Sequence, residues 1–302
     1  IIISPGIDIN NCSLSKFLKR NSKKIFTDLD VFYNFHKKNK KITITGTNGK
    51  STTAKILYEV LKDQKIDVRL VGNIGNPVLL EKHITDKTVF VIEASSYQLE
   101  YSNLYKSNIS LILNISPDHL ERHKTINKYV NAKFRLIEGQ SQNDTAILNT
   151  KNFYINKKIK SKNFLPKIIK VKNDLKKNLL KKINNQYFYS DGNKENLRFA
   201  LEVTKILNLK KESVFKTLKK FKGLEFRQQI IFESRKLTII NDSKATSFSS
   251  SVSLLKSLTN VYWIVGGEAK KGDKLLLSKK HCKNFKAYII GSDKNFFINK
   301  VK

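Results

Sequence analysis

The chain has 302 residues, of which 40% are hydrophobic, and a formal net charge of +33. Its length predicts about two domains that can bury real cores. It contains no apolar run of about 18 residues, which argues against a membrane-spanning helix, and its first residues lack the basic region and long apolar core of a signal peptide.

The strong positive charge comes almost entirely from lysine, because only seven of the 58 basic residues are Arg. Proteins that read nucleic acid usually use Arg for its bidentate fork, and here the Lys residues are spread along the chain. Nucleic-acid binding is therefore a secondary hypothesis, whereas attraction of anionic substrates such as nucleotides follows directly. Cys12 and Cys282 form no disulfide framework or metal-ligand pattern, which fits a reducing cytoplasm.

The first 36 residues predict a short strand at residues 1–3 and a turn at Ser4-Pro5-Gly6-Ile7. A segment of this length cannot build a core of its own. The chain also contains no Met and hence no initiator, so we expect it to be a piece of a longer protein.

A phosphate-binding loop is predicted at residues 42–53, around which the rest of the chain is organised. Residues 42–45 form an apolar, β-branched run typical of a buried parallel strand. A turn containing Gly46 and Gly49 follows, and then a helix with its apolar residues spaced as on one face. Glycines let backbone N–H groups approach phosphates, and the helix N-terminus adds positive potential. Lys50 would reach the outer phosphates and Ser51 would hold Mg²⁺.

Further apolar runs at residues 68–71, 88–92 and 109–113 predict more strands, the last two ending at Glu93 and Asn114. Strands that alternate with helices predict a doubly wound, mostly parallel sheet. Ligands of such sheets gather at the carboxyl ends of the strands, so Glu93 and Asn114 are candidate site residues. Taken alone, Glu93 is equally compatible with a solvated loop acid or a helix cap.

Two histidines follow, His119 and His123, at a spacing that on a helix could grip one metal ion. Leu120 stands where a zinc hydrolase would need Glu, so that class is disfavoured. Beside a nucleotide loop, His119 becomes a candidate Mg²⁺ ligand. Residues 129–137 predict an amphipathic helix carrying Lys133, which in isolation would be interpreted as a solvated Lys.

The remaining sequence is less informative until residue 237. Residues 151–187 predict only strand fragments or surface loops, and helices are expected at residues 193–207 and 212–219. A domain boundary is predicted near Gly223. Strands at residues 237–240, 261–265 and 287–290 predict a second α/β unit, and the first of them leads into the motif Asn241-Asp242-Ser243-Lys244-Ala245-Thr246.

These motifs, in this order, resemble the Mur ligase family of peptidoglycan synthesis. The shortened loop at residues 46–52 is shared by many members. The segments at residues 72–75, 93–100, 113–123 and 241–246 resemble those of members that add D-glutamate to UDP-N-acetylmuramoyl-L-alanine. The sequence departs from the family at Gly192, Phe226, Gln229 and Ser247, which bears on the adenine contacts and the linker geometry but not on the reaction class.

The resemblance implies an α/β fold. It comprises a remnant of a UDP-sugar domain with its linker (residues 1–36), a central P-loop domain with a doubly wound, mostly parallel sheet (residues 37–222) and a truncated C-terminal Rossmann-like domain (residues 223–302). It implies that ATP phosphorylates the alanyl carboxylate and that the amine of D-glutamate attacks the acyl phosphate. We therefore expect a cytoplasmic, monomeric ligase that binds Mg-ATP, although the chain alone is expected not to complete ligation.

The same resemblance assigns the site residues. Catalytic roles fall on Lys50, Glu93, His119 and Lys133. Two Mg²⁺ ions would be held by Ser51, Glu93, His119 and Lys133, the last as an N-carboxylated lysine. ATP would contact Gly46, Thr47, Asn48, Gly49, Lys50, Ser51, Thr52, Asn193, Asn196, Arg227 and Asp242. The UDP-sugar substrate and D-glutamate would contact Ser4, Gly6, Asn73, Lys244, Thr246 and Lys270.

Two alternatives remain open at this point. Another Mur-type or folate-glutamate ligase would share the reaction, but the segment at residues 95–99 argues against it. A basic P-loop module that binds nucleic acid would explain the charge, but it would leave Glu93, His119 and the motif at residues 241–246 without a role.

Overall fold

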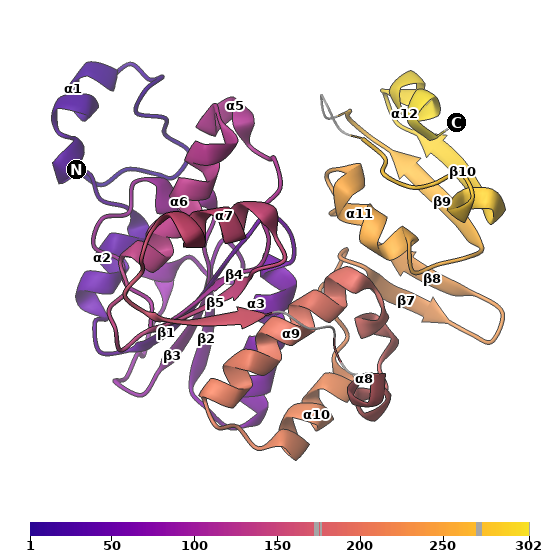
Figure 1. Ribbon diagram of the computed structural model, residues 1–302, viewed down its shortest axis with the longest axis horizontal. Helices are drawn as coiled ribbons and strands as arrows, with labels where there is room; N and C mark the ends of the chain where they lie inside the picture. The colour runs from indigo at the N-terminus through magenta and orange to yellow at the C-terminus, as the bar shows by residue number, and fades with distance from the viewer. Residues whose placement is uncertain (172–174, 176, 270–273, 302) are drawn as a thin grey trace. The chain divides into compact units, whose positions relative to one another are not determined.

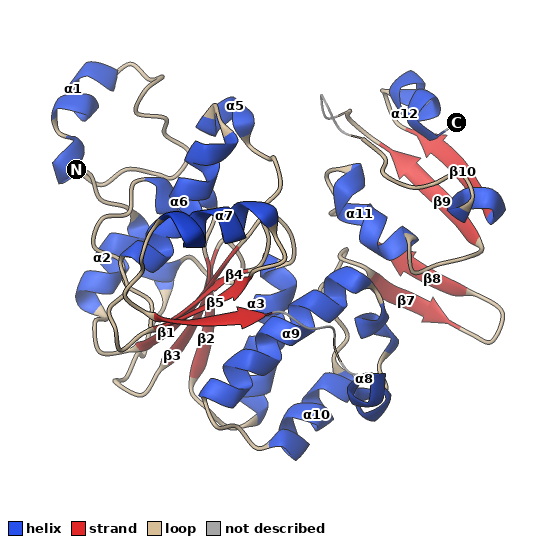
Figure 2. Cartoon of the chain, viewed as in Figure 1, coloured by secondary structure: helices blue, strands red, loops and turns tan. Residues whose placement is uncertain are grey.

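The computed structural model describes residues 1–171, 175, 177–269 and 274–301. The chain divides into two compact units (Figure 1), one made of residues 1–175 and 196–218 and the other of residues 176–195 and 219–302. The predicted α/β class is confirmed (Figure 2), whereas the predicted boundaries at residues 36 and 222 stay predictions. None of the described helices is long and apolar enough to cross a membrane.

A six-stranded, fully parallel sheet forms the centre of the first unit, with the order β2-β3-β1-β4-β5-β6. Because β1 lies between β3 and β4, the chain crosses to the other side of β1 after β3. Such a crossing opens a crevice at the carboxyl ends of the strands, where α/β proteins bind ligands. The strands are β1 (Lys40–Thr45), β2 (Val68–Gly72), β3 (Val89–Glu93), β4 (Ile109–Ile112), β5 (Thr145–Asn149) and β6 (Lys167–Val171).

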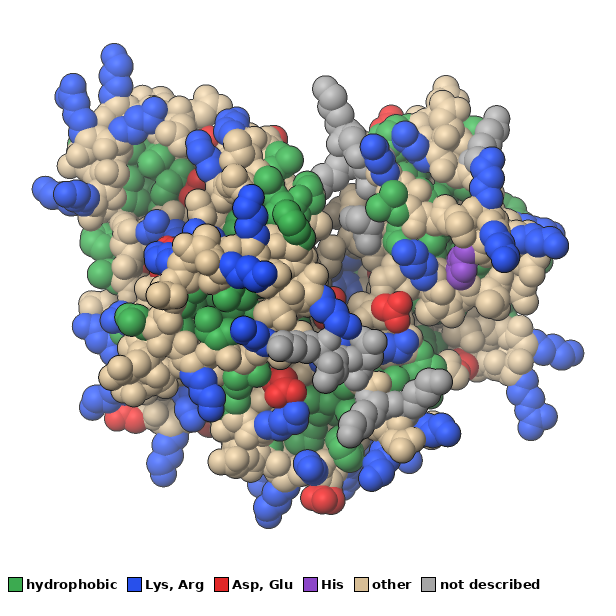
Figure 3. All heavy atoms as spheres, viewed as in Figure 1, with side chains coloured by type: hydrophobic (Ala, Val, Ile, Leu, Met, Phe, Trp, Pro, Cys, Tyr) green, Lys and Arg blue, Asp and Glu red, His purple; other side chains and the backbone are tan. Residues whose placement is uncertain are grey.

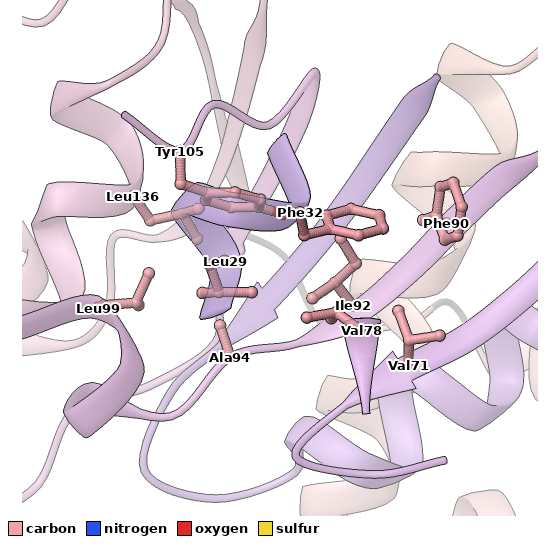
Figure 4. Close-up of a cluster of buried hydrophobic side chains, with 10 residues drawn as sticks. All are labelled: Leu29, Phe32, Val71, Val78, Phe90, Ile92, Ala94, Leu99, Tyr105 and Leu136. Carbon is pink, nitrogen blue, oxygen red and sulfur yellow. The ribbon is translucent and has the colours of Figure 1, made fainter. Parts of the chain in front are cut away.

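Helices cover this sheet (Figure 1), and many of its apolar side chains are buried. One core cluster joins Leu29 and Phe32 of α2 to Val71, Phe90 and Ile92 of the strands (Figure 4). The helices that begin in this unit are α1 (Ser15–Arg20), α2 (Asp28–Phe35), α3 (Lys50–Asp63), α4 (Ser96–Glu100), α5 (Leu120–His123), α6 (Ile126–Glu138), α7 (Phe153–Ser161) and α10 (Lys211–Lys220), with 3₁₀ turns η1 (Ser22–Lys24) and η2 (Val78–Leu80).

The segment before β1 is part of the first unit and contributes a small buried cluster of Ile3, Leu18 and Ile25. The backbone N–H of Ile3 donates to the carbonyl of Phe26 (3.0 Å). Asp30 closes a capping box at the start of α2 with Thr27. Its buried carboxylate also accepts hydrogen bonds from the backbone N–H groups of Leu104 (2.8 Å) and Tyr105 (2.9 Å). A buried carboxylate is stable only when such donors satisfy it, so Asp30 ties α2 to the chain that precedes β4.

Several elements of the first unit were not predicted from the sequence, among them β5 and the helices α1, α2, α4 and α7. The expectation of strand fragments or loops for residues 151–187 is wrong for α7 and for helix α8 (Lys177–Ile183), while β6 fits it. Helix α7 begins where the side chain of Asn152 accepts the N–H of Ile155 (3.2 Å), and Ile155 is fully buried. A cap, the buried Ile155 and the partly buried Ile159 outweigh the polar, Lys-rich composition of this stretch.

The second unit contains two small sheets, with β7 (Gln229–Glu233) antiparallel to β8 (Thr238–Asn241) and β9 (Val261–Gly266) parallel to β10 (Phe285–Ile290). The strands expected near residues 237, 261 and 287 are thus present, and β7 is an addition. Phe248 of α11 packs on the rings of Trp263 and Phe297. The helices are α8 (Lys177–Ile183), α11 (Phe248–Leu255) and α12 (Lys294–Val301), with 3₁₀ turns η3 (Gln186–Tyr189) and η4 (His281–Asn284), while α9 (Asp191–Ile206) belongs to both units.

Candidate active site

The predicted phosphate loop joins β1 to α3. Gly49 has a φ of +85°, and a Cβ there would lie 2.1 Å from Oδ1 of Asn196. Only glycine therefore fits, and Asn196, a predicted nucleotide residue, lies directly beside the loop. The same amide oxygen accepts the hydroxyl of Thr53 (3.3 Å). Ser51 and Thr52 are buried in the first turn of α3.

The chain after β4 holds this loop in place through backbone and side-chain hydrogen bonds. The backbone N–H of Thr47 donates to the carbonyl of Asn114 (2.8 Å), and that of Asn48 donates to the Asn114 side chain (2.8 Å). The hydroxyl of Thr47 lies 3.1 Å from that of Tyr129 on α6. The prediction that Asn114 lies at the phosphate-binding end of the sheet is correct, and its role there is to fix the loop.

Two lysines converge on one carbonyl of the loop. The ammonium group of Lys50 donates to the carbonyls of Gly46 (3.0 Å) and Thr47 (2.9 Å). The Nζ atom of Lys133 donates to the carbonyl of Gly46 (2.9 Å) and more weakly to the hydroxyl of Thr45 (3.5 Å). The two amines are therefore close neighbours, which is unfavourable if both carry a charge.

Lys133 is only 1% exposed and lies over the ring of Tyr129, 4.5 Å from its centroid. Burial, followed by the charge of Lys50, holds the pKa of Lys133 well below its ordinary value, although Asp118 and Glu93 oppose the shift. The interpretation of Lys133 as a solvated surface lysine is thus wrong. Its amine is buried and faces the loop, and this burial disfavours the charged ammonium form.

Glu93 occupies the end of β3, where its backbone lies between Ile44 of β1 and Gly72 of β2. Gly72 has a φ of +104°, and a Cβ would meet the carbonyl of Glu93 at 2.3 Å, so glycine is required. The side chain of Asn73 donates to Oε1 of Glu93 (2.9 Å). The other oxygen, Oε2, is buried and has no hydrogen-bond partner among the described residues.

A buried carboxylate oxygen without a partner is costly unless a cation or a donor completes it. Mg²⁺ takes hard oxygen ligands and usually keeps several waters or phosphate oxygens. The described residues contain no group of three or more His, Cys, Asp or Glu side chains that could hold a metal ion. Oε2 of Glu93 fits one ligand position of a magnesium ion whose other ligands include phosphate oxygens and water.

His119 is not part of a helix face, contrary to the expectation that it shares one with His123. It precedes α5 in the left-handed region (φ = 53°), and its Nδ1 lies 3.0 Å from the hydroxyl of Tyr97. Its ring centroid lies 6.3 Å from that of Tyr129, which bonds the phosphate loop. Tyr97 was not predicted, because no spacing rule links a residue of α4 to the residue before α5.

His123 is buried beside the same two tyrosines, with its ring centroid 5.7 Å from that of Tyr97 and 5.3 Å from that of Tyr129. Its Nε2 lies 3.0 Å from the hydroxyl of Ser96. Burial is the main reason that its pKa is lowered to about 4. An unfolded histidine titrates at about 6.5. The unfolded chain therefore takes up a proton between these two pH values that the folded chain does not, which weakens folding as the pH falls.

We predict that His123 lowers the free energy of unfolding as the pH falls from about 6.5 to about 4. Asp242, whose pKa is raised to about 6, acts in the opposite direction over this range, so the test is the difference between proteins: His123→Gln should keep more of its pH 7 stability at pH 5 than the wild type does. Urea titrations followed by far-UV circular dichroism at pH 7 and pH 5 measure it. His83→Gln, at an exposed histidine, is the matched control and should behave as the wild type. An equal loss in all three proteins would contradict the prediction.

The second unit holds the other predicted nucleotide residues. The side chain of Asn193 donates to the carbonyl of Tyr187 (2.8 Å) and to Gln228 (3.0 Å). Asp242 accepts the backbone N–H of Gln228 (3.1 Å), and burial raises its pKa to about 6. Gln228 thus links these two residues. Arg227 adjoins Gln228 in the chain, Lys244 and Thr246 are exposed, and Lys270 lies outside the described residues.

The predicted substrate residues Ser4 and Gly6 form a tight turn near the N-terminus. The backbone N–H of Ile7 donates to the carbonyl of Ser4 (3.0 Å). On the visible face of the molecule, Lys and Arg side chains are scattered among other types and form no continuous stripe (Figure 3). This distribution supports the low rank given to nucleic-acid binding.

Comparisons with known proteins agree with this geometry. Residues 44–229 match the model of the Mur ligase middle domain. The whole chain is 35% identical to the UDP-N-acetylmuramoylalanine–D-glutamate ligase of Francisella tularensis subsp. novicida and 31% identical to that of Rickettsia bellii, and it covers 72% and 71% of these relatives.

Solved structures show the same fold. The UDP-N-acetylmuramate–alanine ligase of Thermotoga maritima superposes with a TM-score of 0.65 at 16% identity, over 99% of this chain and 73% of that one. The MurF ligase of the same organism in complex with ADP superposes with a TM-score of 0.60 at 17% identity, over 93% of this chain and 79% of that one.

Proposed function

The chain belongs to the Mur ligase family, and on that premise we propose that it is an ATP-dependent ligase that joins D-glutamate to UDP-N-acetylmuramoyl-L-alanine. D-glutamate is proposed as the amino-acid substrate because the whole chain matches D-glutamate ligases at 31–35% identity. The reaction serves peptidoglycan synthesis and, because it consumes ATP and a UDP-sugar, it belongs in the cytoplasm. A monomer is sufficient for it.

In this proposal the phosphate loop holds ATP. The N-terminus of α3 and the loop N–H groups other than those of Thr47 and Asn48, which bond Asn114, would face the phosphates. Lys50 would leave the carbonyls of Gly46 and Thr47 to pair with the outer phosphates. Asn196, beside Gly49, limits the space on that side of the loop. Phosphoryl transfer of this kind is catalysed mostly by positioning and charge neutralisation, which is what these groups provide.

Magnesium, when bound, supplies charge neutralisation between the phosphates and the acceptor carboxylate. Ser51 and Oε2 of Glu93 are proposed to hold one ion, and Glu93, His119 and a modified Lys133 the second. Asn73 keeps Oε1 of Glu93 occupied, which leaves Oε2 for the ion. It is also placed to steady the alanyl carboxylate of the substrate.

The modification proposed at Lys133 is an N-carboxy group. The neutral amine attacks carbon dioxide, a C–N bond forms, and a proton leaves to water, which gives an anionic carbamate. Burial at the loop favours a neutral amine over an ammonium ion, and the oxygen atoms of a carbamate suit a hard cation. The carbamate would also replace the repulsion between Lys50 and Lys133 with attraction.

The second unit is proposed to complete the nucleotide site and to receive the amino acid. Asn193, Arg227 and Asp242 would contact the nucleoside part of ATP, and Lys244, Thr246 and Lys270 would contact D-glutamate and the phosphates. We also propose the domain boundaries. Residues 1–36 would belong to the UDP-sugar domain and its linker, residues 37–222 to the central domain, and residues 223–302 to the C-terminal domain.

The proposed amino acid is tested by phosphate release from ATP in the complete gene product with UDP-N-acetylmuramoyl-L-alanine as the acceptor. D-glutamate should stimulate release, while L-alanine, diaminopimelate and lysine should not. Equal or greater stimulation by one of the other amino acids would replace D-glutamate in the proposal and leave the reaction type unchanged.

A further inference from the structure

The side chain of Arg122, in α5, connects three separate parts of the first unit. Its Nε donates to the carboxylate of Glu100 (3.0 Å). Its Nη1 and Nη2 donate to the backbone carbonyls of Gly6 (3.1 Å) and Ile7 (2.6 Å). The guanidinium group is therefore bonded along more than one edge, and its side chain is only 9% exposed.

Two tyrosine rings fix the plane of this guanidinium group. The centre of the group lies 5.2 Å from the ring centroid of Tyr97 and 5.7 Å from that of Tyr101, within the range of cation–π attraction. The hydroxyl of Tyr97 is also the group that lies 3.0 Å from Nδ1 of His119. One tyrosine thus touches both Arg122 and the proposed metal ligand.

The contacts of Arg122 link two segments that the proposed function assigns to the site. The carbonyls that Arg122 holds belong to the turn at residues 4–7, which carries Ser4 and Gly6. At the other end, α5 has only four residues and begins after the left-handed His119. A left-handed backbone at a residue other than glycine persists only where the surroundings impose it.

We propose that Arg122 is a positioning residue that sets the turn at residues 4–7, and the UDP-sugar substrate bound to it, relative to His119. This inference rests on the proposed function for the identity of the substrate, but not for the contact itself. A planar fork with several directed donors can hold two carbonyls and a carboxylate at once, whereas a lysine ammonium cannot reproduce that geometry.

Arg122→Lys is the informative variant, because it keeps a positive charge beside the half-buried Glu100 and removes the fork. Arg135→Lys is the matched control. Arg135 also bonds a backbone carbonyl, that of Ser102, through Nε (3.0 Å) and Nη2 (2.7 Å), and its other hydrogen bond goes to the side chain of Asn103 rather than to the turn. Both variants are made in the complete enzyme, and thermal unfolding confirms that each is folded.

Two readouts are measured. Hydrogen exchange at the amide of Ile7, which closes the turn, should be accelerated in Arg122→Lys and unchanged in Arg135→Lys. The KM for the UDP-sugar should rise about tenfold in Arg122→Lys, since a lost bidentate bond is worth roughly 1.4 kcal/mol, while the KM for ATP stays within about twofold.

Unchanged exchange at Ile7 in Arg122→Lys would overturn the proposal, as would equal changes in the two variants. A rise in both KM values together would reduce Arg122 to a general structural role and would also overturn it. If the wild-type enzyme showed no D-glutamate ligation while exchange at Ile7 responded as expected, the proposed substrate would fail and the positioning of the turn would stand.

Discussion

Replacing Lys50 with alanine is expected to reduce ATP turnover by at least about 10²–10³, the usual cost of one preorganised charge in a water-poor site. The Lys50 ammonium donates hydrogen bonds to the loop carbonyls of Gly46 and Thr47. These contacts are replaceable by water, whereas the pairing of the ammonium with the outer phosphates is not. The fold should therefore survive the substitution.

The measurement is ATP hydrolysis in the presence of both substrates, with circular dichroism to confirm the fold. Lys55→Ala is the matched control, because Lys55 lies on the same helix and pairs with Glu59 (3.2 Å) rather than with the loop. Wild-type turnover in Lys50→Ala would show that residues 46–52 are not the phosphate-binding loop.

Replacing Lys133 with alanine is expected to abolish ligation, and a short carboxylic acid such as formate or acetate should restore part of it. The variant loses both the buried amine and the carbamate proposed on it, and the space left beside the loop can admit a small carboxylate. Lys128→Ala on the same helix, at an exposed lysine, should cost little because surface substitutions usually change stability by less than about 0.5 kcal/mol.

A second readout for Lys133 does not depend on activity. With ¹³C-labelled bicarbonate, the wild-type protein should show a carbamate carbon resonance that is absent from Lys133→Ala and present in Lys128→Ala. Unchanged activity in Lys133→Ala, or a carbamate signal that persists in it, would remove Lys133 from the proposed metal site.

The sequence predicted the parts of the site that lie at strand ends. A β-branched run, a glycine turn and an apolar helix predict the loop at residues 46–52. Glu93 and Asn114 end neighbouring runs, and the carboxyl ends of parallel strands meet at one edge of a sheet. The sheet order then places β3 and β4 on either side of β1, so both residues lie next to the loop.

The burial of Lys133 could also have been predicted from the sequence. It lies four residues after Tyr129 and four before Ile137, both fully buried, and this spacing marks one face of a helix. The left-handed backbone of His119 and its contact with Tyr97 could not have been predicted. They depend on tertiary contacts of a four-residue helix, which leave no periodic pattern. β5 was missed because its five residues lie between a turn and a capped helix.

The central claim is that this site activates a carboxylate by phosphorylation, and an isotope-transfer experiment tests it most directly. UDP-N-acetylmuramoyl-L-alanine labelled with ¹⁸O in its alanyl carboxylate is ligated to D-glutamate by the complete enzyme, and the released phosphate is analysed by mass spectrometry. Attack of the amine on an acyl phosphate leaves one carboxylate oxygen on the phosphate, so the account predicts one ¹⁸O atom per phosphate released from fully labelled substrate. Ligation that releases unlabelled phosphate would contradict it.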